Sequence, residues 1–229
     1  MRTKILLFAT AVLTAGAVSL NAQVYSANVV GYVSYINQTN APGYELICNP
    51  VDSGSNTIKN IFPTAPSGST ISLWTGTGYL TATYSSLLGG HWKTNGVTAD
   101  TMLLSPGTGF FIQIAGSSSY TNTFVGTVQP WTGVSTNFSM GTSAQLVSSL
   151  VPYGDYVTNS STINLTNPAS GTTITTWNVA ASGYQTYTWS SLLGGHWKLN
   201  GVNNTPFINV GQGFFFQPAA TYTWTQTGP

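Results

Sequence analysis

The chain has 229 residues, of which only 4% are charged, with five lysines and arginines against four aspartates and glutamates. Ordinary soluble domains are about 25% charged, so the sequence offers no basic patch with which to bind nucleic acid or an anionic membrane surface. Its single cysteine, Cys48, excludes an intramolecular disulfide and is predicted to be a small buried residue.

Residues 1–22 have the pattern of a secretory signal peptide. Arg2 and Lys4 are followed by an uncharged apolar run over 5–20, and small residues lead to Ala22 as the last residue before cleavage. The apolar run is short for a membrane span, and no later window holds eighteen uninterrupted apolar residues. We therefore expect an exported protein without membrane insertion, located outside the cell or on its surface, with the periplasm as the alternative.

The rest of the chain predicts short β-strands separated by turns. Asn95-Gly96 lies between apolar runs, and this pair is a specific signal for a type I′ hairpin turn. Residues 56–62 are predicted either as one helical turn or as a loop. Runs rich in β-branched and aromatic residues predict strands at 24–36, 70–74, 79–84, 109–114, 120–125 and 221–225. Short strands at such spacing are typical of all-β sandwiches or barrels.

The sequence also contains an internal repeat. The nine residues from Ser85 to Lys93 recur unchanged from Ser190 to Lys198, and the flanking segments match less closely. Matching segments of this length indicate a duplicated module. The matched pairs are 68–74 with 171–177 and 106–111 with 210–215. We predict a signal peptide at 1–22, a first β module at 23–129, a linker at 130–133 and a second β module at 134–229.

Three motifs carry a resemblance to a known group. They are the start Gln23–Val33, with its Val-Tyr-Ser-Ala-Asn-Val-Val-Gly-Tyr-Val run, the element Gly43–Pro50 and the element Pro106–Phe111. In these the chain resembles uncharacterised exported Verrucomicrobia-type repeat proteins with two β modules. The resemblance implies export and a β-module architecture, and it carries no substrate, cofactor or catalytic residue.

The repeated segment contains the only histidines of the chain. In a strand, histidine and lysine of a His-Trp-Lys triplet share one face and the tryptophan points to the other. One interpretation places the tryptophans in two cores. The other makes each triplet a binding patch, one per module. The residues of this candidate patch are His91, Trp92, Lys93, His196, Trp197 and Lys198.

Acidic and metal-ligating residues do not form a catalytic pattern. Glycoside hydrolysis needs a pair of carboxyl groups, yet no acidic residue follows Asp155, and Glu45 is replaced by Gln145 in the second copy. One histidine per module and one cysteine cannot complete a zinc site, and calcium needs several carboxylates. We predict no catalytic residue, no metal site, no cofactor and no enzymatic activity.

Aromatic residues make up 13% of the chain. Trp74, Trp177, Phe110 and Phe214 are predicted to fill the cores, whereas three tryptophans are predicted to be exposed: Trp131, Trp189 and Trp224. Exposed aromatic faces beside hydroxyl and amide side chains suit sugar rings, which stack on the ring face and form hydrogen bonds at their edges.

Three functional hypotheses follow from the sequence. The first is a non-catalytic secreted or cell-surface structural or adhesive protein, whose partners are other copies of itself or other cell-surface components. The alternative is a carbohydrate-binding protein that binds polysaccharide through exposed tryptophan and tyrosine. The remote alternative is a secreted hydrolase.

Overall fold

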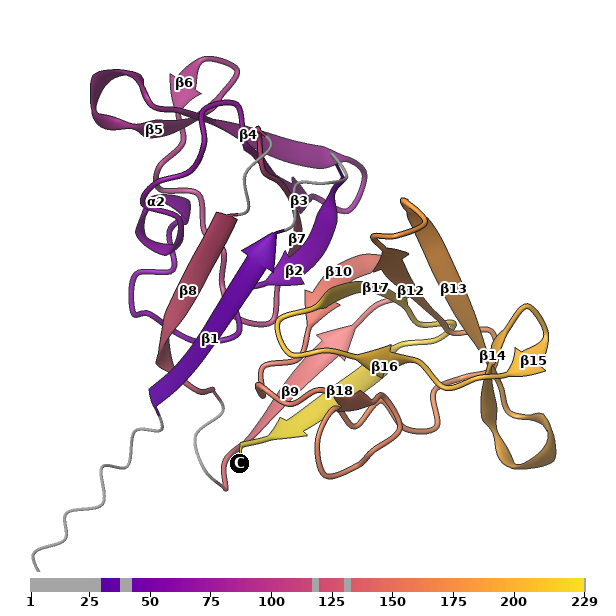
Figure 1. The fold of residues 1–229 in the computed structure, drawn as a ribbon. Helices are drawn as coiled ribbons and strands as arrows, with labels where there is room; N and C mark the ends of the chain where they lie inside the picture. The colour runs from indigo at the N-terminus through magenta and orange to yellow at the C-terminus, as the bar shows by residue number, and fades with distance from the viewer. Residues whose placement is uncertain (1–29, 38–42, 117–119, 130–132, 229) are drawn as a thin grey trace, which may run out of the picture.

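The computed structural model describes residues 30–37, 43–116, 120–129 and 133–228. They form two β modules of the same topology, each with a six-stranded antiparallel sheet and a two-stranded ribbon (Figure 1). The all-β fold with two modules is therefore as predicted. The predicted signal peptide at 1–22 and most of the predicted linker at 130–133 lie outside the described residues.

The described residues of the first module form eight strands. Its sheet has the order β2 (Glu45–Cys48), β7 (Gly109–Gln113), β3 (Thr70–Trp74), β4 (Tyr79–Ser85), β5 (His91–Thr94) and β6 (Val97–Thr98). Its ribbon pairs β1 (Val30–Asn37) with β8 (Tyr120–Thr127). A short helix, α2 (Ile58–Ile61), lies where the sequence allowed a helical turn, with Thr57 as its N-cap residue. A 3₁₀ turn, η2 (Leu87–Gly89), joins β4 to β5.

The second module repeats this arrangement. Its sheet has the order β10 (Gln145–Ser148), β17 (Gly213–Gln217), β12 (Thr173–Asn178), β13 (Gly183–Ser190), β14 (His196–Leu199) and β15 (Val202–Asn203). The ribbon pairs β9 (Ser135–Met140) with β18 (Tyr222–Thr227), and η3 (Leu192–Gly194) corresponds to η2. A short extra pair joins β11 (Asp155–Tyr156) to β16 (Phe207–Ile208).

Each Asn-Gly pair forms the predicted hairpin. Asn95 has φ 51° and Gly96 has φ 81°, and the turn joins β5 to β6. Asn200 and Gly201 have nearly the same angles, 52° and 81°, between β14 and β15. Positive φ at both central residues is what a type I′ turn requires, so this prediction is confirmed.

Each sheet packs its inner face onto the ribbon of its own module. In β7, Phe110 and Ile112 point into the first core, where Phe124 of β8 meets them. In β17, Phe214 and Phe216 point into the second core. Because side chains alternate along a strand, Phe111 and Phe215 point to the opposite face of each sheet. That outer face turns toward the other module.

The tryptophans buried in the two cores are only partly the ones that the sequence predicts. Trp189 and Trp224 are buried in the second core, so the expectation that they are exposed was wrong. Trp74 and Trp177 are only partly buried and pack outside both cores, so the expectation that they are core residues was also wrong. The physical reason is strand alternation. Trp74 lies three positions after the buried Ile71, and Trp177 lies three positions after the buried Ile174, so both indoles point to the opposite face of the sheet. Trp131 lies outside the described residues.

The two modules meet across a local two-fold relation. Cys48 N donates to Gly211 O at 2.9 Å, and Ser148 N, its counterpart, donates to Gly107 O at 3.0 Å. The two Gly-x-Gly-Phe-Phe motifs cross here, since a Cβ on Gly213 would lie 3.1 Å from the Gly109 Cα. The second glycine of each motif is therefore required by close backbone approach.

Cys48 lies beside this crossing and is buried, as predicted. Its burial raises the pKa of the thiol to about 12, even though the hydrogen bond with Ser148 lowers it. The thiol therefore stays protonated and unreactive at neutral pH.

Among the described residues, no helix has the length and apolar character needed to cross a membrane.

Candidate functional site

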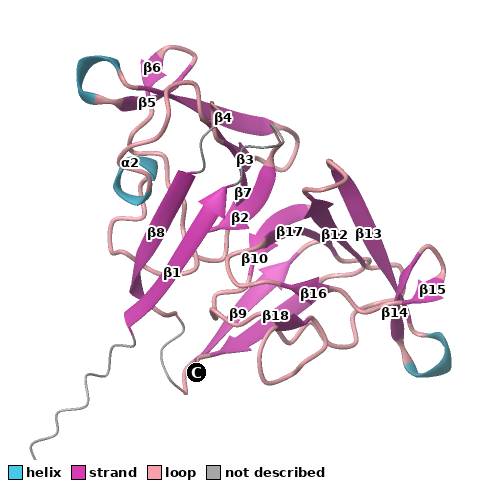
Figure 2. Ribbon diagram, in the orientation of Figure 1, coloured by secondary structure: helices cyan, strands magenta, loops and turns pink. Residues whose placement is uncertain are grey.

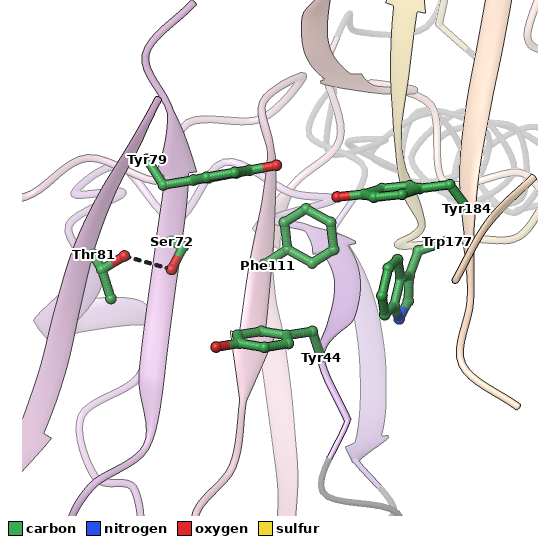
Figure 3. Close-up of a pocket in the computed structure, with 7 residues that line it drawn as sticks. All are labelled: Tyr44, Ser72, Tyr79, Thr81, Phe111, Trp177 and Tyr184. Carbon is green, nitrogen blue, oxygen red and sulfur yellow. Dashed lines mark hydrogen bonds between the residues drawn. The ribbon is translucent and has the colours of Figure 1, made fainter. Parts of the chain in front are cut away.

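A cavity of about 290 Å³ opens between the outer faces of the two modules. Its lining combines aromatic rings with two hydroxyl side chains and contains no charged side chain (Figure 3). The lining residues are Tyr44, Ser72, Tyr79, Thr81, Phe111, Trp177 and Tyr184. Three of them are substantially exposed tyrosines, since Tyr44, Tyr79 and Tyr184 keep 43%, 45% and 53% of their surface accessible.

Two equivalent hairpins supply the walls of the cavity. Trp74 in β3 lies opposite Tyr79 in β4, and Trp177 in β12 lies opposite Tyr184 in β13. The rings of each pair meet edge to face, with centroids 5.1 Å and 4.9 Å apart. Cross-strand aromatic pairs stabilise a hairpin, so the local pairing fixes the orientation of both tyrosines.

Phe111 in β7 forms the floor. Its ring meets Trp177 at 5.6 Å, Tyr79 at 5.8 Å and Tyr44 at 6.2 Å, each close to perpendicular. Leu46 and Leu146 pack beneath the same aromatic rings. Residues from both modules thus hold Phe111, which makes the cavity a feature of the assembled pair.

The polar groups of the cavity are hydroxyls. Ser72 Oγ and Thr81 Oγ1 are hydrogen-bonded at 2.7 Å on the wall of the first module. The Tyr79 and Tyr184 hydroxyls face each other from opposite modules (Figure 3). Burial raises the pKa of Tyr79, and the hydrogen bond with Tyr184 raises it further. Both effects keep the Tyr79 hydroxyl uncharged at neutral pH.

The local two-fold relation is broken at the cavity. Tyr44, just before β2, has Ala144, just before β10, as its counterpart. Trp74 Nε1 donates to Ala144 O at 3.0 Å. The equivalent Trp177 Nε1 is buried and has no hydrogen-bond partner among the described residues. The ring of Tyr44, which Ala144 lacks, therefore forms one wall of the cavity beside Trp177.

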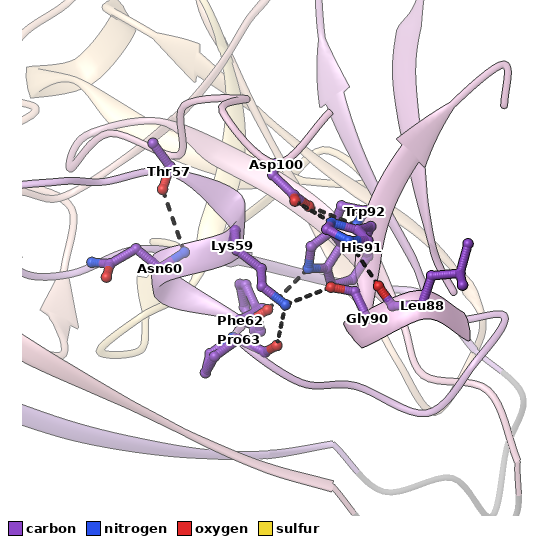
Figure 4. Close-up of polar contacts among 10 residues, drawn as sticks. All are labelled: Thr57, Lys59, Asn60, Phe62, Pro63, Leu88, Gly90, His91, Trp92 and Asp100. Carbon is purple, nitrogen blue, oxygen red and sulfur yellow. Dashed lines mark hydrogen bonds and ion pairs between the residues drawn. The ribbon is translucent and has the colours of Figure 1, made fainter. Parts of the chain in front are cut away.

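The structure divides the candidate His-Trp-Lys patch between two faces. Trp92 and Trp197 are 0% and 1% exposed in the two cores, and Trp92 Nε1 donates to Phe62 O at 2.9 Å (Figure 4). Buried rings cannot stack on a ligand. A binding role for the triplets therefore remains a prediction for their histidines and lysines only.

The lysines lie on the outer faces of the sheets. Lys93 is directly opposite Thr83, on the face that carries Tyr79 and Thr81. Lys198 is directly opposite Thr188, on the face that carries Tyr184. The structure thus places one cation of each triplet on the same sheet face as the cavity wall, in the strand next to the one that carries Tyr79 or Tyr184.

His91 is held in a polar network (Figure 4). Its Nδ1 lies 2.7 Å from Asp100 Oδ2, and its Nε2 lies 3.1 Å from Leu88 O. Trp92 N donates to the other Asp100 oxygen at 2.8 Å. In the second module Thr205 takes the position of Asp100, so His196 keeps only its contact with Leu193 O at 3.1 Å. The pair thus belongs to one module and is no repeated catalytic dyad.

This network predicts a pH dependence. Burial raises the pKa of Asp100, but the hydrogen bonds from His91 and Trp92 N outweigh it and hold the pKa below its usual 3.8. A carboxyl whose pKa is lowered on folding stabilises the protein above its unfolded pKa, and this contribution is lost as pH falls through the folded pKa. We expect Asp100→Asn to be less stable than the wild type at pH 6, with the gap narrowing below pH about 4.

Urea denaturation at a series of pH values measures this difference. Asp155→Asn is a second test of the same rule, because the pKa of Asp155 is also lowered, chiefly by the Tyr156 N–H and without a histidine contact, so its stability gap should narrow in acid as well. A stability gap for Asp100→Asn that stays constant from pH 6 to acid would contradict the assignment.

Sequence reasoning missed the cavity residues. The signal was present, because Trp74-Tyr79 and Trp177-Tyr184 are repeated pairs flanking a hairpin and lie on the strand face opposite to Ile71 and Ile174. Within the described parts of the chain, no group of three or more histidine, cysteine, aspartate or glutamate side chains is placed to hold a metal ion.

Comparison with protein-family models, curated proteins and solved structures finds no match to this chain. The resemblance to exported repeat proteins stays a prediction, and the site is interpreted from its own chemistry.

Proposed function

We propose that the protein is a non-catalytic adhesive protein, exported to the cell surface or its surroundings, that binds a neutral carbohydrate chain in the cavity between its modules. The observation that carries the proposal is the convergence of five aromatic side chains from both modules on one uncharged cavity. Small-molecule sites combine apolar and aromatic walls with a few placed polar groups, and this cavity has that composition.

The chemistry of sugars accounts for each part of the lining. The C–H face of a sugar ring packs on an aromatic ring such as Tyr184 or Tyr44, and its hydroxyls form hydrogen bonds with Ser72, Thr81 and the tyrosine hydroxyls. Because no charged group lines the cavity, a neutral sugar suits it better than an acidic one. None of the four acidic residues lines it either, which supports binding without hydrolysis.

The proposal places the carbohydrate hypothesis ahead of a purely structural role. Export rests on residues 1–22, whose pattern is that of a signal peptide. A surface with very few charges and many hydroxyl and amide groups is suited to contact with uncharged polymers. Adhesion then follows from an exported, folded β protein that holds a polysaccharide.

Affinity electrophoresis and calorimetry with neutral polysaccharides (glucans, mannans and xylans) test the proposal. We expect the wild type to be retained by at least one of them, and Tyr184→Ala to bind about tenfold more weakly or worse, because a stacking ring is lost. Tyr184→Phe keeps the ring and should lose less. Thermal unfolding of each variant shows whether the fold survives.

Tyr156→Ala is the matched control, because Tyr156 has the same 53% exposure as Tyr184 but lies outside the cavity. Failure of the wild type to bind any neutral polysaccharide, or equal binding by Tyr184→Ala and Tyr156→Ala, would overturn the carbohydrate proposal.

A further inference from the structure

Each copy of the repeated segment contains a pair of adjacent, exposed leucines. Leu87 and Leu88 in η2 are 70% and 91% exposed, and Leu192 and Leu193 in η3 are 72% and 95% exposed. We call these pairs the leucine tips. Exposed single leucines are ordinary, but here two adjacent leucines are exposed at the same position of both modules.

The backbone at the tips is unfavourable for leucine. Leu88 has φ 56° and Leu193 has φ 55°, in the left-handed region that glycine and asparagine adopt at lower cost. Every other described non-glycine residue with positive φ is an asparagine or a serine. A leucine side chain that is almost fully exposed gains little from packing, so the stability of the fold does not account for it.

The rest of the repeated segment is explained by the fold. A Cβ on Gly90 would collide with the Tyr84 side chain, and one on Gly195 would lie 2.5 Å from Trp189. The histidine after each of these glycines contacts the carbonyl of the tip leucine, at 3.1 Å in both modules. The glycines, histidine and tryptophan thus shape the turn, and they leave the leucine side chains without an intramolecular role.

The tips lie far apart. Figure 2 shows η2 and η3 at opposite ends of the molecule, beside the hairpins β5–β6 and β14–β15. Strands β6 and β15 are the last strands of their sheets, and each pairs on one side only among the described strands. Val97 and Val202 in these strands are exposed as well. Each end of the molecule therefore presents an apolar tip beside an open sheet edge.

We propose that the leucine tips are self-association surfaces, each meeting the tip of a second copy of this chain. Two equivalent patches at opposite ends make every molecule bivalent, so tip-to-tip contacts extend into linear chains of molecules. A flat surface such as a lipid bilayer would not engage two opposite ends together. Net charge also favours a second copy, since three lysines and four acidic residues beyond residue 22 give little repulsion between copies.

The expected contact is weak. Each tip offers two exposed leucines beside a two-residue edge strand, far fewer than the roughly 20–30 residues per side of a stable interface, so we expect association to be reversible and to depend on concentration. Linear chains of an adhesive molecule would multiply its contacts with a polymer. The proposal does not depend on the carbohydrate proposal, because no tip residue lines the cavity.

Light scattering coupled to size exclusion, on protein from the complete chain, tests the proposal over a wide range of concentration. We expect the wild-type mass to rise with concentration and electron microscopy to show linear chains. Leu88→Asn with Leu193→Asn should stay at the mass of one molecule, and since asparagine tolerates left-handed φ, it should fold normally. Leu88→Asn alone leaves one tip and should stop at two molecules.

The control pair is Leu103→Asn with Val134→Asn, which removes two exposed apolar side chains outside the tips and should associate like the wild type. A wild type that stays at the mass of one molecule at every concentration would sink the proposal. Unchanged association of the double tip variant would do the same, and so would tip-dependent binding of single molecules to phosphatidylcholine vesicles. Single molecules of the double tip variant should bind polysaccharide as tightly as single molecules of the wild type, because no tip residue lines the cavity. This result separates the two proposals.

Discussion

Replacing Trp92 with alanine is expected to lower the free energy of unfolding by about 3–5 kcal/mol, because the indole is fully buried in the first core. Its ring packs against Tyr84 at 5.3 Å and Phe62 at 6.4 Å, and both contacts would be replaced by a cavity. The Phe62 carbonyl would also lose the hydrogen bond from Trp92 Nε1. Urea denaturation followed by tyrosine and tryptophan fluorescence measures the change.

The same truncation at Trp197 tests the second core, where the ring packs on Trp189 at 5.5 Å. Trp197 Nε1 has no partner among the described residues, so Trp197→Phe should cost less than Trp92→Phe. Leu193→Ala, in the same repeated segment, is the control and should change stability by less than about 0.5 kcal/mol. Folded, stable Trp92→Ala protein that has lost only ligand retention would show that the tryptophans form a binding patch instead.

Gly126→Ala is expected to destabilise the protein by about 3 kcal/mol, because there is no space for a methyl group. A Cβ at this position would lie 2.5 Å from the Asp52 carbonyl carbon and 2.9 Å from Ser53 N. Both are backbone atoms, held by reciprocal hydrogen bonds of 2.8 Å between Asp52 and Thr127. The clash is therefore relieved only by separating β8 from the segment that follows β2. The urea midpoint of the variant measures the effect.

Gly78→Ala controls for the loss of a glycine, because a Cβ at Gly78 meets nothing within 4 Å and its φ is not positive. We expect it to shift the stability by less than about 0.5 kcal/mol. If Gly126→Ala and Gly78→Ala unfold at the same urea concentration, the close approach of Asp52 to β8 is wrong.

Local sequence patterns determined much of the fold. Strand runs such as 70–74 and 79–84, the Asn-Gly hairpins and the repeat are local signals, and the corresponding elements form where they were predicted. Period-two alternation also placed His91 and Trp92 on opposite faces of one strand. These features follow from backbone geometry and turn chemistry, which act over a few residues.

The sequence alone did not say what covers each face of a strand. Alternation separates Ile174 from Trp177, but it does not say that the ribbon of the same module covers Ile174 and that the first module covers Trp177. For the same reason Trp189, set among polar neighbours, was assigned to the surface although its face meets the core.

The local sequence determined the two β modules, their turns and the alternation of their strands. Only the tertiary structure decided that the outer faces meet, because contact between Phe111 and Trp177 depends on how two distant segments cross at Gly109 and Gly213. The same crossing forms the aromatic cavity and leaves the leucine tips at opposite ends. Long-range packing, which no local pattern encodes, thus placed both candidate functional surfaces.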